Sequence, residues 1–198
     1  MSGDAAPTDP RSAWRTLAAK IDARFAEVQA RHATQMQCGA GCVSCCQSGL
    51  TVTALEAIAV VEAIEAMPRR QQSNLRQTSH TRIQSARCPL LDDQGRCSIY
   101  ESRPIICRSH GLPLLQVTSA DSTPELSCCI LNFCDADIPE DAILDSGQLT
   151  TTVFVANQLL CSRLGISPTA RFALADLLTQ GRSLLPAALY TQLEQDRR

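Results

Sequence analysis

Residues 38–49 read Cys-Gly-Ala-Gly-Cys-Val-Ser-Cys-Cys-Gln-Ser-Gly and contain Cys38, Cys42, Cys45 and Cys46. Cysteines separated by two or three residues can bring two sulfurs to one metal from a single turn of the chain. Thiolates are soft ligands that suit zinc, copper(I) and iron–sulfur centres. Gly39 and Gly41 allow backbone conformations with positive φ, which are useful when a chain must fold its own sulfurs around one point. This segment therefore predicts a metal-binding loop.

The neighbouring pair Cys45-Cys46 carries further information about that site. Adjacent side chains diverge by about 100° in a helix and point to opposite faces of a strand. Chelation of one tetrahedral ion by both sulfurs is therefore awkward. Two interpretations stay open. Either both cysteines bind a polynuclear centre or two sites back to back, or one binds and the other is a redox partner or a core residue.

A second group of cysteines follows at Cys88, Cys97 and Cys107. Their gaps are too long for one turn and suit a small hairpin and the loop after it, which would bring three more sulfurs to a shared centre. Arg103 and Arg108 stand beside this group. They could neutralise an anionic thiolate site, or they could form ordinary surface salt bridges.

The composition is that of a globular protein, with 44% hydrophobic and 19% charged residues in 198. The net charge is −2 without a long basic run, so nothing favours a nucleic-acid partner. The N-terminus has no secretory pattern, and no segment reaches the roughly 18 apolar residues of a membrane span. We therefore expect a cytoplasmic protein, in which eleven cysteines indicate metal or redox chemistry rather than disulfides.

The chain is predicted to be mainly α. We expect a disordered tail over 1–8 and a single compact helical domain over 9–198. Its cysteine-rich loop region, about 36–134, has room for a short β-hairpin, and its C-terminal helices cover about 139–196. The expected helices span about 10–32, 54–66, 68–84, 139–145, 148–164, 168–180 and 186–196.

Local signals mark the ends of several of these helices. Asp9 and Pro10 form an N-cap and a first helical residue, and Ser167-Pro168 repeats this pattern. Thr53 and Glu56 form a capping box. The remaining expectations are a turn over 92–95, a short strand over 97–100, an exposed loop over 116–127, and Leu75 and Ile83 as the apolar anchors of the helix over 68–84.

Several separate blocks of the sequence resemble the motifs of one family, and they occur in the same order along the chain. These are the run from Cys38 to Cys46, the Thr53–Glu56 box, and Cys-Pro-Leu-Leu-x5-Cys-x-Ile-Tyr-Glu-x-Arg-Pro-x2-Cys-Arg over 88–108. Together they resemble the CxxCxxCC family of zinc- or iron-chelating domains, the YkgJ-type cysteine-cluster proteins. The resemblance covers about 36–134. One departure is that the first gap here has three residues in place of two.

The resemblance implies a set of metal ligands. They are Cys38, Cys42, Cys45, Cys46, Cys88, Cys97, Cys107 and, in the block Cys129-Ile-Leu-Asn-Phe133, Cys129. Larger proteins similar to this family, the flagellin lysine methyltransferases, use the cysteine motif with an iron–sulfur cluster. The resemblance therefore implies an iron–sulfur cluster ahead of a zinc or iron ion as the cofactor.

The other candidates have weaker patterns. Cys128, Cys134 and His110 could each add a ligand. Cys161 lies on an apolar helical stripe and is predicted to be a core residue, whereas His32 and His80 are predicted to face solvent.

Three functions remain open from the sequence. The first is a metal-binding protein whose centre is structural or stored. The second is an iron–sulfur enzyme or redox carrier, for example one related to protein methyl transfer. The third is a zinc-stapled interaction module. No catalytic residues are assigned, because no triad order, phosphate loop, carboxylate pair or glycine-rich nucleotide motif stands out. The protein partner and the oligomeric state stay open.

Overall fold

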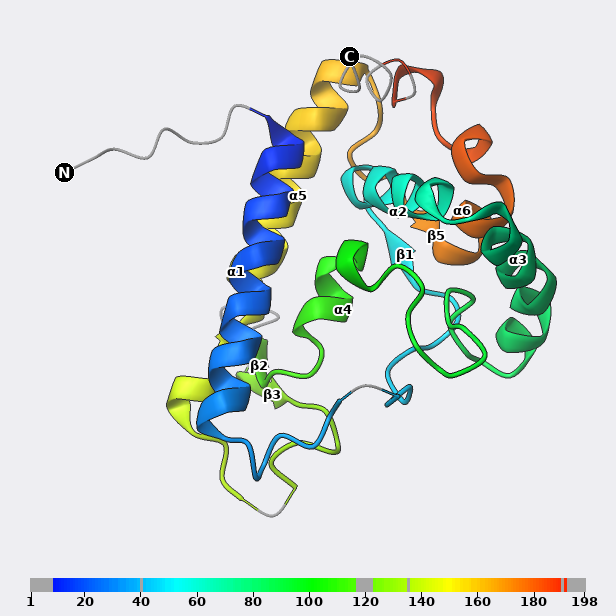
Figure 1. The fold of residues 1–198 in the computed structure, drawn as a ribbon. Coiled ribbons are helices and arrows are strands. Elements are labelled where there is room, and N and C mark those ends of the chain that lie inside the picture. Colours follow the sequence, from blue (N-terminus) through cyan, green and yellow to red (C-terminus); the bar gives the residue numbers. More distant parts are fainter. Residues whose placement is uncertain (1–8, 40, 117–122, 135, 190, 192–198) are drawn as a thin grey trace. The chain divides into compact units, whose positions relative to one another are not determined.

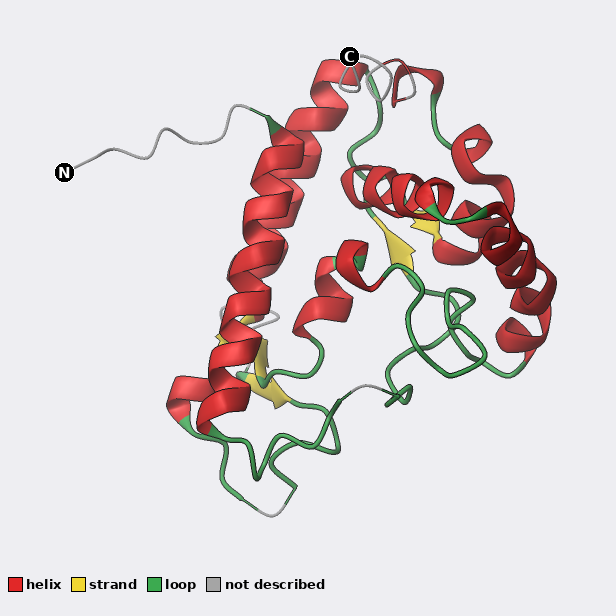
Figure 2. Cartoon of the chain, in the orientation of Figure 1, coloured by secondary structure: helices red, strands yellow, loops and turns green. Residues whose placement is uncertain are grey.

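The computed structural model describes residues 9–39, 41–116, 123–134, 136–189 and 191 (Figure 1). Helices dominate these residues, and the strands are short (Figure 2), so the prediction of a mainly α protein is confirmed. The helices are α1 (Pro10–Arg31), α2 (Ala54–Ala66), α3 (Arg69–Gln84), α4 (Ile105–Ser109), α5 (Ser146–Leu164) and α6 (Leu174–Gln180). The short 3-10 helices are η1 (Tyr100–Ser102), η2 (Glu140–Ala142) and η3 (Gly181–Leu184). The strands are β1 (Thr51–Val52), β2 (Leu114–Gln116), β3 (Glu125–Ser127), β4 (Leu144–Asp145) and β5 (Phe172–Ala173).

The chain divides into two compact units. Unit 1 contains residues 1–40 and 105–156, and unit 2 contains residues 41–104 and 157–198. The predicted single domain over 9–198 stays a prediction. The predicted tail over 1–8 lies outside the described residues, as does most of the predicted helix over 186–196, of which 187–189 and 191 are helical.

Unit 1 is built on α1, which begins where the sequence predicted. The Asp9 carboxylate accepts hydrogen bonds from the backbone N–H of Arg11 and of Ser12, which caps the first turn. One face of the helix is buried, and α4 packs against α1. A small core lies at its C-terminal end and contains Val28, Met36, Leu112, Phe133 and Ala142.

A three-stranded sheet completes unit 1. Its order is β3-β2-β4, with β3 antiparallel and β4 parallel to β2. The predicted exposed loop over 116–127 is wrong at its ends, because Gln116 pairs with Glu125. Residues 117–122 lie outside the described residues. The predicted helix over 139–145 shortens to η2, because Leu144 and Asp145 pair with β2 instead.

Unit 2 is organised around α2, whose predicted capping box is present. The Thr53 hydroxyl accepts from the Glu56 N–H, and the Glu56 carboxylate accepts from the Thr53 N–H. The large apolar side chains of α2 are buried, and α2 packs against α6. Of the two predicted anchors of α3, Leu75 is buried, but Ile83 is 37% exposed.

The start of α6 differs from the prediction of a helix over 168–180. Ser167 and Pro168 lie in a turn in which the Ala170 N–H donates to the Ser167 carbonyl. Asn157 Nδ2 donates to the Pro168 carbonyl at 2.9 Å, which holds this turn against α5. Residues 172 and 173 then pair with β1 as β5, so α6 begins only at Leu174.

Candidate metal centre

The cysteine loop of unit 2 is a series of turns, as predicted. The Cys46 N–H donates to the Val43 carbonyl, and the Gln47 N–H donates to the Cys45 carbonyl, both at 3.0 Å. Gly41 has φ +89° and so uses the positive φ that glycine allows, whereas Gly39 does not have a positive φ. Figure 2 shows in green that loops precede β1 and follow α3.

Three backbone contacts join this loop to the segment that carries Cys88. The Cys88 N–H donates to the Cys46 carbonyl at 2.9 Å. The Ser48 N–H donates to the Ala86 carbonyl at 3.0 Å, and Gln47 and Arg87 form an isolated β-bridge. The pairing places the neighbouring Cys45 and Cys46 beside Cys88, although α2 and α3 separate them in sequence.

The end of α3 delivers Cys88 to this position through an unusual residue. Ala86 has φ +57°, a left-handed conformation that non-glycine residues seldom adopt. The Ala86 N–H donates to the Ile83 carbonyl, and the Arg87 N–H donates to the Arg82 carbonyl at 2.7 Å. These two bonds are those of a Schellman motif, in which glycine is the usual residue at the left-handed position.

A tight turn follows, and it carries Cys97 back toward Cys88. The Asp92 carboxylate accepts from the backbone N–H of Gln94 and of Arg96, at 2.9 and 2.8 Å. The Gly95 N–H donates to the Asp92 carbonyl, which confirms the predicted turn. A bridge joins Leu91 to Cys97, and the predicted short strand over 97–100 is only this bridge, followed by η1.

Burial and mutual repulsion keep these sulfurs protonated at neutral pH. Burial is the main cause that raises the pKa of the Cys88 thiol to about 11, and the nearness of the ionisable Cys97 and Cys45 adds to the effect. Burial also raises the pKa of the Cys97 thiol. A metal that binds them as thiolates must displace their protons.

The two arginines of the second cysteine group have different surroundings. The Arg103 guanidinium lies 3.9 Å from the centre of the Tyr100 ring and donates to the Tyr100 carbonyl at 2.8 Å. Its charge lowers the pKa of Cys97, against the larger effect of burial. Arg108 is buried and pairs with Asp22 of α1, so the surface salt bridge considered for it is wrong.

Unit 1 holds the other candidate cysteines. They are Cys38, Cys107, Cys128, Cys129 and Cys134. Burial raises the pKa of Cys128, and the charges of Cys129 and Cys134 raise it further. Cys134 is exposed, and its Sγ donates to the Ile130 carbonyl at 2.8 Å.

Asn132 organises the cysteine region of unit 1, and the sequence analysis assigned it no role. It is 4% exposed, its Oδ1 accepts from the Cys38 N–H at 2.8 Å, and its Nδ2 donates to the Gly111 carbonyl at 2.7 Å. It also bridges to Met36. One side chain therefore ties the Cys38 loop to the 128–134 turn and to the end of α4. The available signal in the sequence was the position of this asparagine between Cys129 and Cys134.

The weaker candidates have the following positions. Cys161 is fully buried on α5, which confirms it as a core residue. His80 is exposed as predicted, but His32 is not, because it lies 3.4 Å from Asp141 and packs edge-on against Phe133. His110 is exposed, and its role as a ligand stays a prediction.

Within the described ranges, no three His, Cys, Asp or Glu side chains are gathered in a way that could hold a metal ion. The eight predicted ligands stay a prediction as a set. The donors nevertheless suit a soft metal, because they are thiols. Ser98 Oγ, next to Cys97, is buried without a hydrogen-bond partner in the described part of the chain, so a donor remains for a bound sulfur.

Comparison with known proteins supports one assignment. The searches of curated proteins and of solved structures find no match. No helix among the described residues is long and apolar enough to cross a membrane. Residues 37–129 match the model of the family described as "CxxCxxCC: Putative zinc- or iron-chelating domain", so this region of the chain is similar to that family.

Proposed function

We propose that this protein binds an iron–sulfur cluster through cysteine thiolates of its CxxCxxCC domain. The observation that carries the proposal is the hydrogen bond from the Cys88 N–H to the Cys46 carbonyl. It brings together two cysteine groups that are distant in sequence, and the bridge between Leu91 and Cys97 turns Cys97 back toward Cys88 in the second group. A metal centre with ligands from both cysteine groups requires the two groups to lie close together.

The proposed ligands of unit 2 are Cys42, Cys45, Cys46, Cys88 and Cys97. Four thiolates are the usual ligand set of an iron–sulfur cluster. The adjacency of Cys45 and Cys46 favours a polynuclear centre over a single tetrahedral ion, because the two side chains diverge. A zinc or iron ion remains the alternative.

The proposed ligands of unit 1 are Cys38, Cys107 and Cys129. Asn132 supports this part of the proposal, because it holds the Cys38 backbone against the turn that begins with Cys129. When bound, the cluster would supply electron transfer or a structural staple. The residues of the chain hold the sulfurs, bury Cys88 and partly bury Cys97, and place the charge of Arg103 near Cys97.

The test is the metal content and visible spectrum of the protein purified without oxygen. About four irons with acid-labile sulfide per chain, and broad absorption near 400 nm, are expected for a tetra-cysteine cluster. One or two zinc ions and no colour would contradict the cluster and leave the chelating domain. A protein that binds no metal under these conditions would overturn chelation itself, and the cysteines would then be redox thiols.

A further inference from the structure

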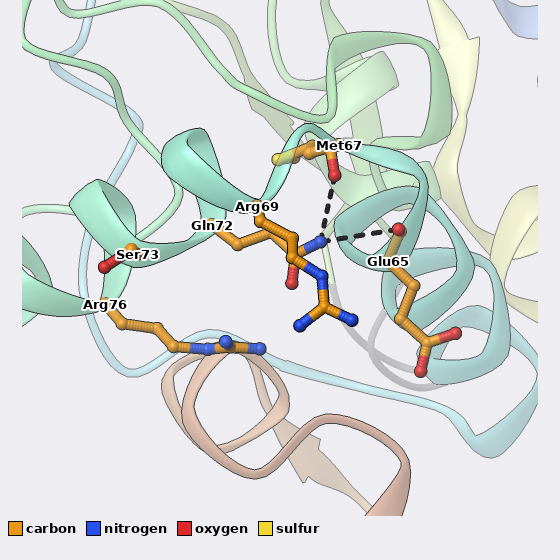
Figure 3. Close-up of a pocket in the computed structure, with 6 residues that line it drawn as sticks. All are labelled: Glu65, Met67, Arg69, Gln72, Ser73 and Arg76. Atoms are coloured by element: carbon orange, nitrogen blue, oxygen red, sulfur yellow. Dashed lines mark hydrogen bonds between the residues drawn. The ribbon is translucent and has the colours of Figure 1, made fainter.

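A hollow separate from the cysteines lies in unit 2, between the end of α2 and the first turns of α3. Its volume is about 480 Å³ (Figure 3). It is lined by Glu65, Met67, Arg69, Gln72, Ser73 and Arg76. These side chains are polar or charged except Met67, so the hollow suits a polar ligand.

The strongest acceptors in the lining are already satisfied by the protein. Gln72 Nε2 donates to the Met67 carbonyl at 2.9 Å and to the Glu65 carbonyl at 3.4 Å, which covers the carbonyl end of α2. The Glu65 carboxylate accepts from Arg182 Nε at 2.6 and 2.7 Å. The negative charge of Glu65 is therefore neutralised from outside the lining.

The two arginines in the lining, in contrast, are not neutralised by carboxylates of the described residues. Arg69 and Arg76 form no ion pair with a carboxylate in the described part of the chain. Arg76 Nε donates to the Leu178 carbonyl at 2.9 Å, which anchors that side chain and leaves its two terminal nitrogens for a ligand. Figure 3 shows the guanidinium groups of Arg69 and Arg76 extending from α3 toward one another. Two positive charges thus remain in the hollow.

The sequence of α3 adds to this positive potential. Residues 69–84 contain four arginines and no Asp or Glu, and only Arg82 pairs with a carboxylate, that of Asp93, among the described residues. The helix begins without a side-chain cap at Arg69, which lines the hollow, so the positive end of the helix dipole lies at its edge. The surplus of hydrogen-bond donors and positive charge at the hollow favours the binding of an anionic ligand.

We propose that this hollow binds a phosphate group, either free or as the monoester of a small molecule. Arginine guanidinium groups match the oxygens of a phosphate through paired N–H bonds. The volume falls within the range of small-molecule sites, which leaves space for an organic part beside the phosphate. The proposal does not depend on the metal centre.

The test is calorimetric titration of the full-length, metal-loaded protein with inorganic phosphate and with phenyl phosphate. Saturable binding of at least one is expected. Arg69→Gln should weaken it by about tenfold or more, as for a lost charged hydrogen bond. Tighter binding of phenyl phosphate would identify an organic phosphate as the ligand class, and equal binding would identify the free anion.

Arg70→Gln is the matched control, because it removes the same charge from the next residue, which lines a different hollow. It should change the affinity by less than about twofold at ionic strengths that screen distant charges. Arg76→Lys keeps the charge but loses the paired N–H geometry, and should weaken binding without unfolding the protein. Absence of saturable binding, or equal losses in Arg69→Gln and Arg70→Gln, would overturn the proposal.

Discussion

The backbone N–H of Cys88 donates to the carbonyl of Cys46 at 2.9 Å, although the whole of α2 and α3 lies between them in sequence. This hydrogen bond directly links the two cysteine groups of unit 2. It depends on where α3 ends and on how the loop after it turns.

Replacement of a cysteine at this link should remove metal, whereas replacement of a core cysteine should not. Cys46→Ser and Cys88→Ser are expected to lower the bound metal by more than half, because serine is a poor ligand for soft metals. Cys161→Ala is the control, since Cys161 is buried on α5 and lies outside the predicted ligand set. The measurement is metal per chain after anaerobic gel filtration. Full metal content in both serine variants would argue against these two ligands.

Glycine at position 86 should stabilise the protein. Ala86 has φ +57°, and a left-handed conformation costs an L-residue about 1 kcal/mol that glycine does not incur. Ala86→Gly is therefore expected to raise the free energy of unfolding by about 0.5–1 kcal/mol, measured by urea denaturation at a fixed metal content.

Ala63→Gly, in the middle of α2, is the matched comparison. It should lower the free energy of unfolding by about 1 kcal/mol, because glycine is a poor residue within a helix. A loss of stability in Ala86→Gly as well would contradict the account of the α3 terminus.

The turn that carries Cys97 should weaken in acid. Partial burial raises the pKa of Asp92, but the N–H groups of Arg96 and Gln94 and the Arg96 guanidinium lower it more, so the net pKa lies below its ordinary value of 3.8. A lowered pKa in the folded state contributes stability above pH 3.8, and that contribution is lost as the pH falls through the folded-state pKa.

Asp92→Asn keeps an oxygen acceptor for the two N–H groups but carries no charge. The difference in unfolding free energy between this variant and the natural protein should therefore shrink as the pH falls below about 3.8. Urea denaturation at a series of pH values between 5 and 2.5 measures this difference. The range extends about one pH unit to each side of the ordinary pKa of 3.8. A difference that is constant over this range would show that the Asp92 charge does not stabilise the turn.

Asn132 should be essential for the cysteine region of unit 1. Asn132→Ala removes both side-chain bonds and leaves the Cys38 N–H and the Gly111 carbonyl without their partner. The expected loss of unfolding free energy is about 2–4 kcal/mol for two buried groups. Asn132→Asp keeps the acceptor for Cys38 and should retain more of the hydrogen-exchange protection at that N–H than Asn132→Ala. Equal exchange at Cys38 in both variants would contradict this role.

Metal binding should release protons. Burial raises the pKa of Cys88 to about 11, so its thiol is protonated at neutral pH and must lose its proton to bind as thiolate. The apparent affinity for zinc should therefore rise with pH between 6 and 8, by about tenfold per unit for each released proton. Calorimetry of the metal-free protein in buffers of different ionisation enthalpy measures the proton number. A value of zero would mean that the bound sulfurs were already ionised.

Sequence patterns predicted the elements whose signals lie within a few residues. Asp9 and Pro10 mark the start of α1, and Thr53 and Glu56 mark that of α2, because a cap is a bond between near neighbours. The turn at Asp92 was equally local. Errors appeared where a competing partner was distant in sequence: β5 delayed α6, and β4 shortened the helix expected over 139–145.

The sequence by itself therefore determined a mainly α chain, the starts of α1 and α2, and a set of thiols suited to a soft metal. Only the tertiary structure decided that Cys88 lies beside Cys46, that Asn132 holds Cys38, and that Arg108 is buried against Asp22. The physical reason is that each of these contacts joins backbone or side-chain groups far apart in sequence. Their free energy depends on the packing of the elements between them, and no short pattern of residues encodes that packing.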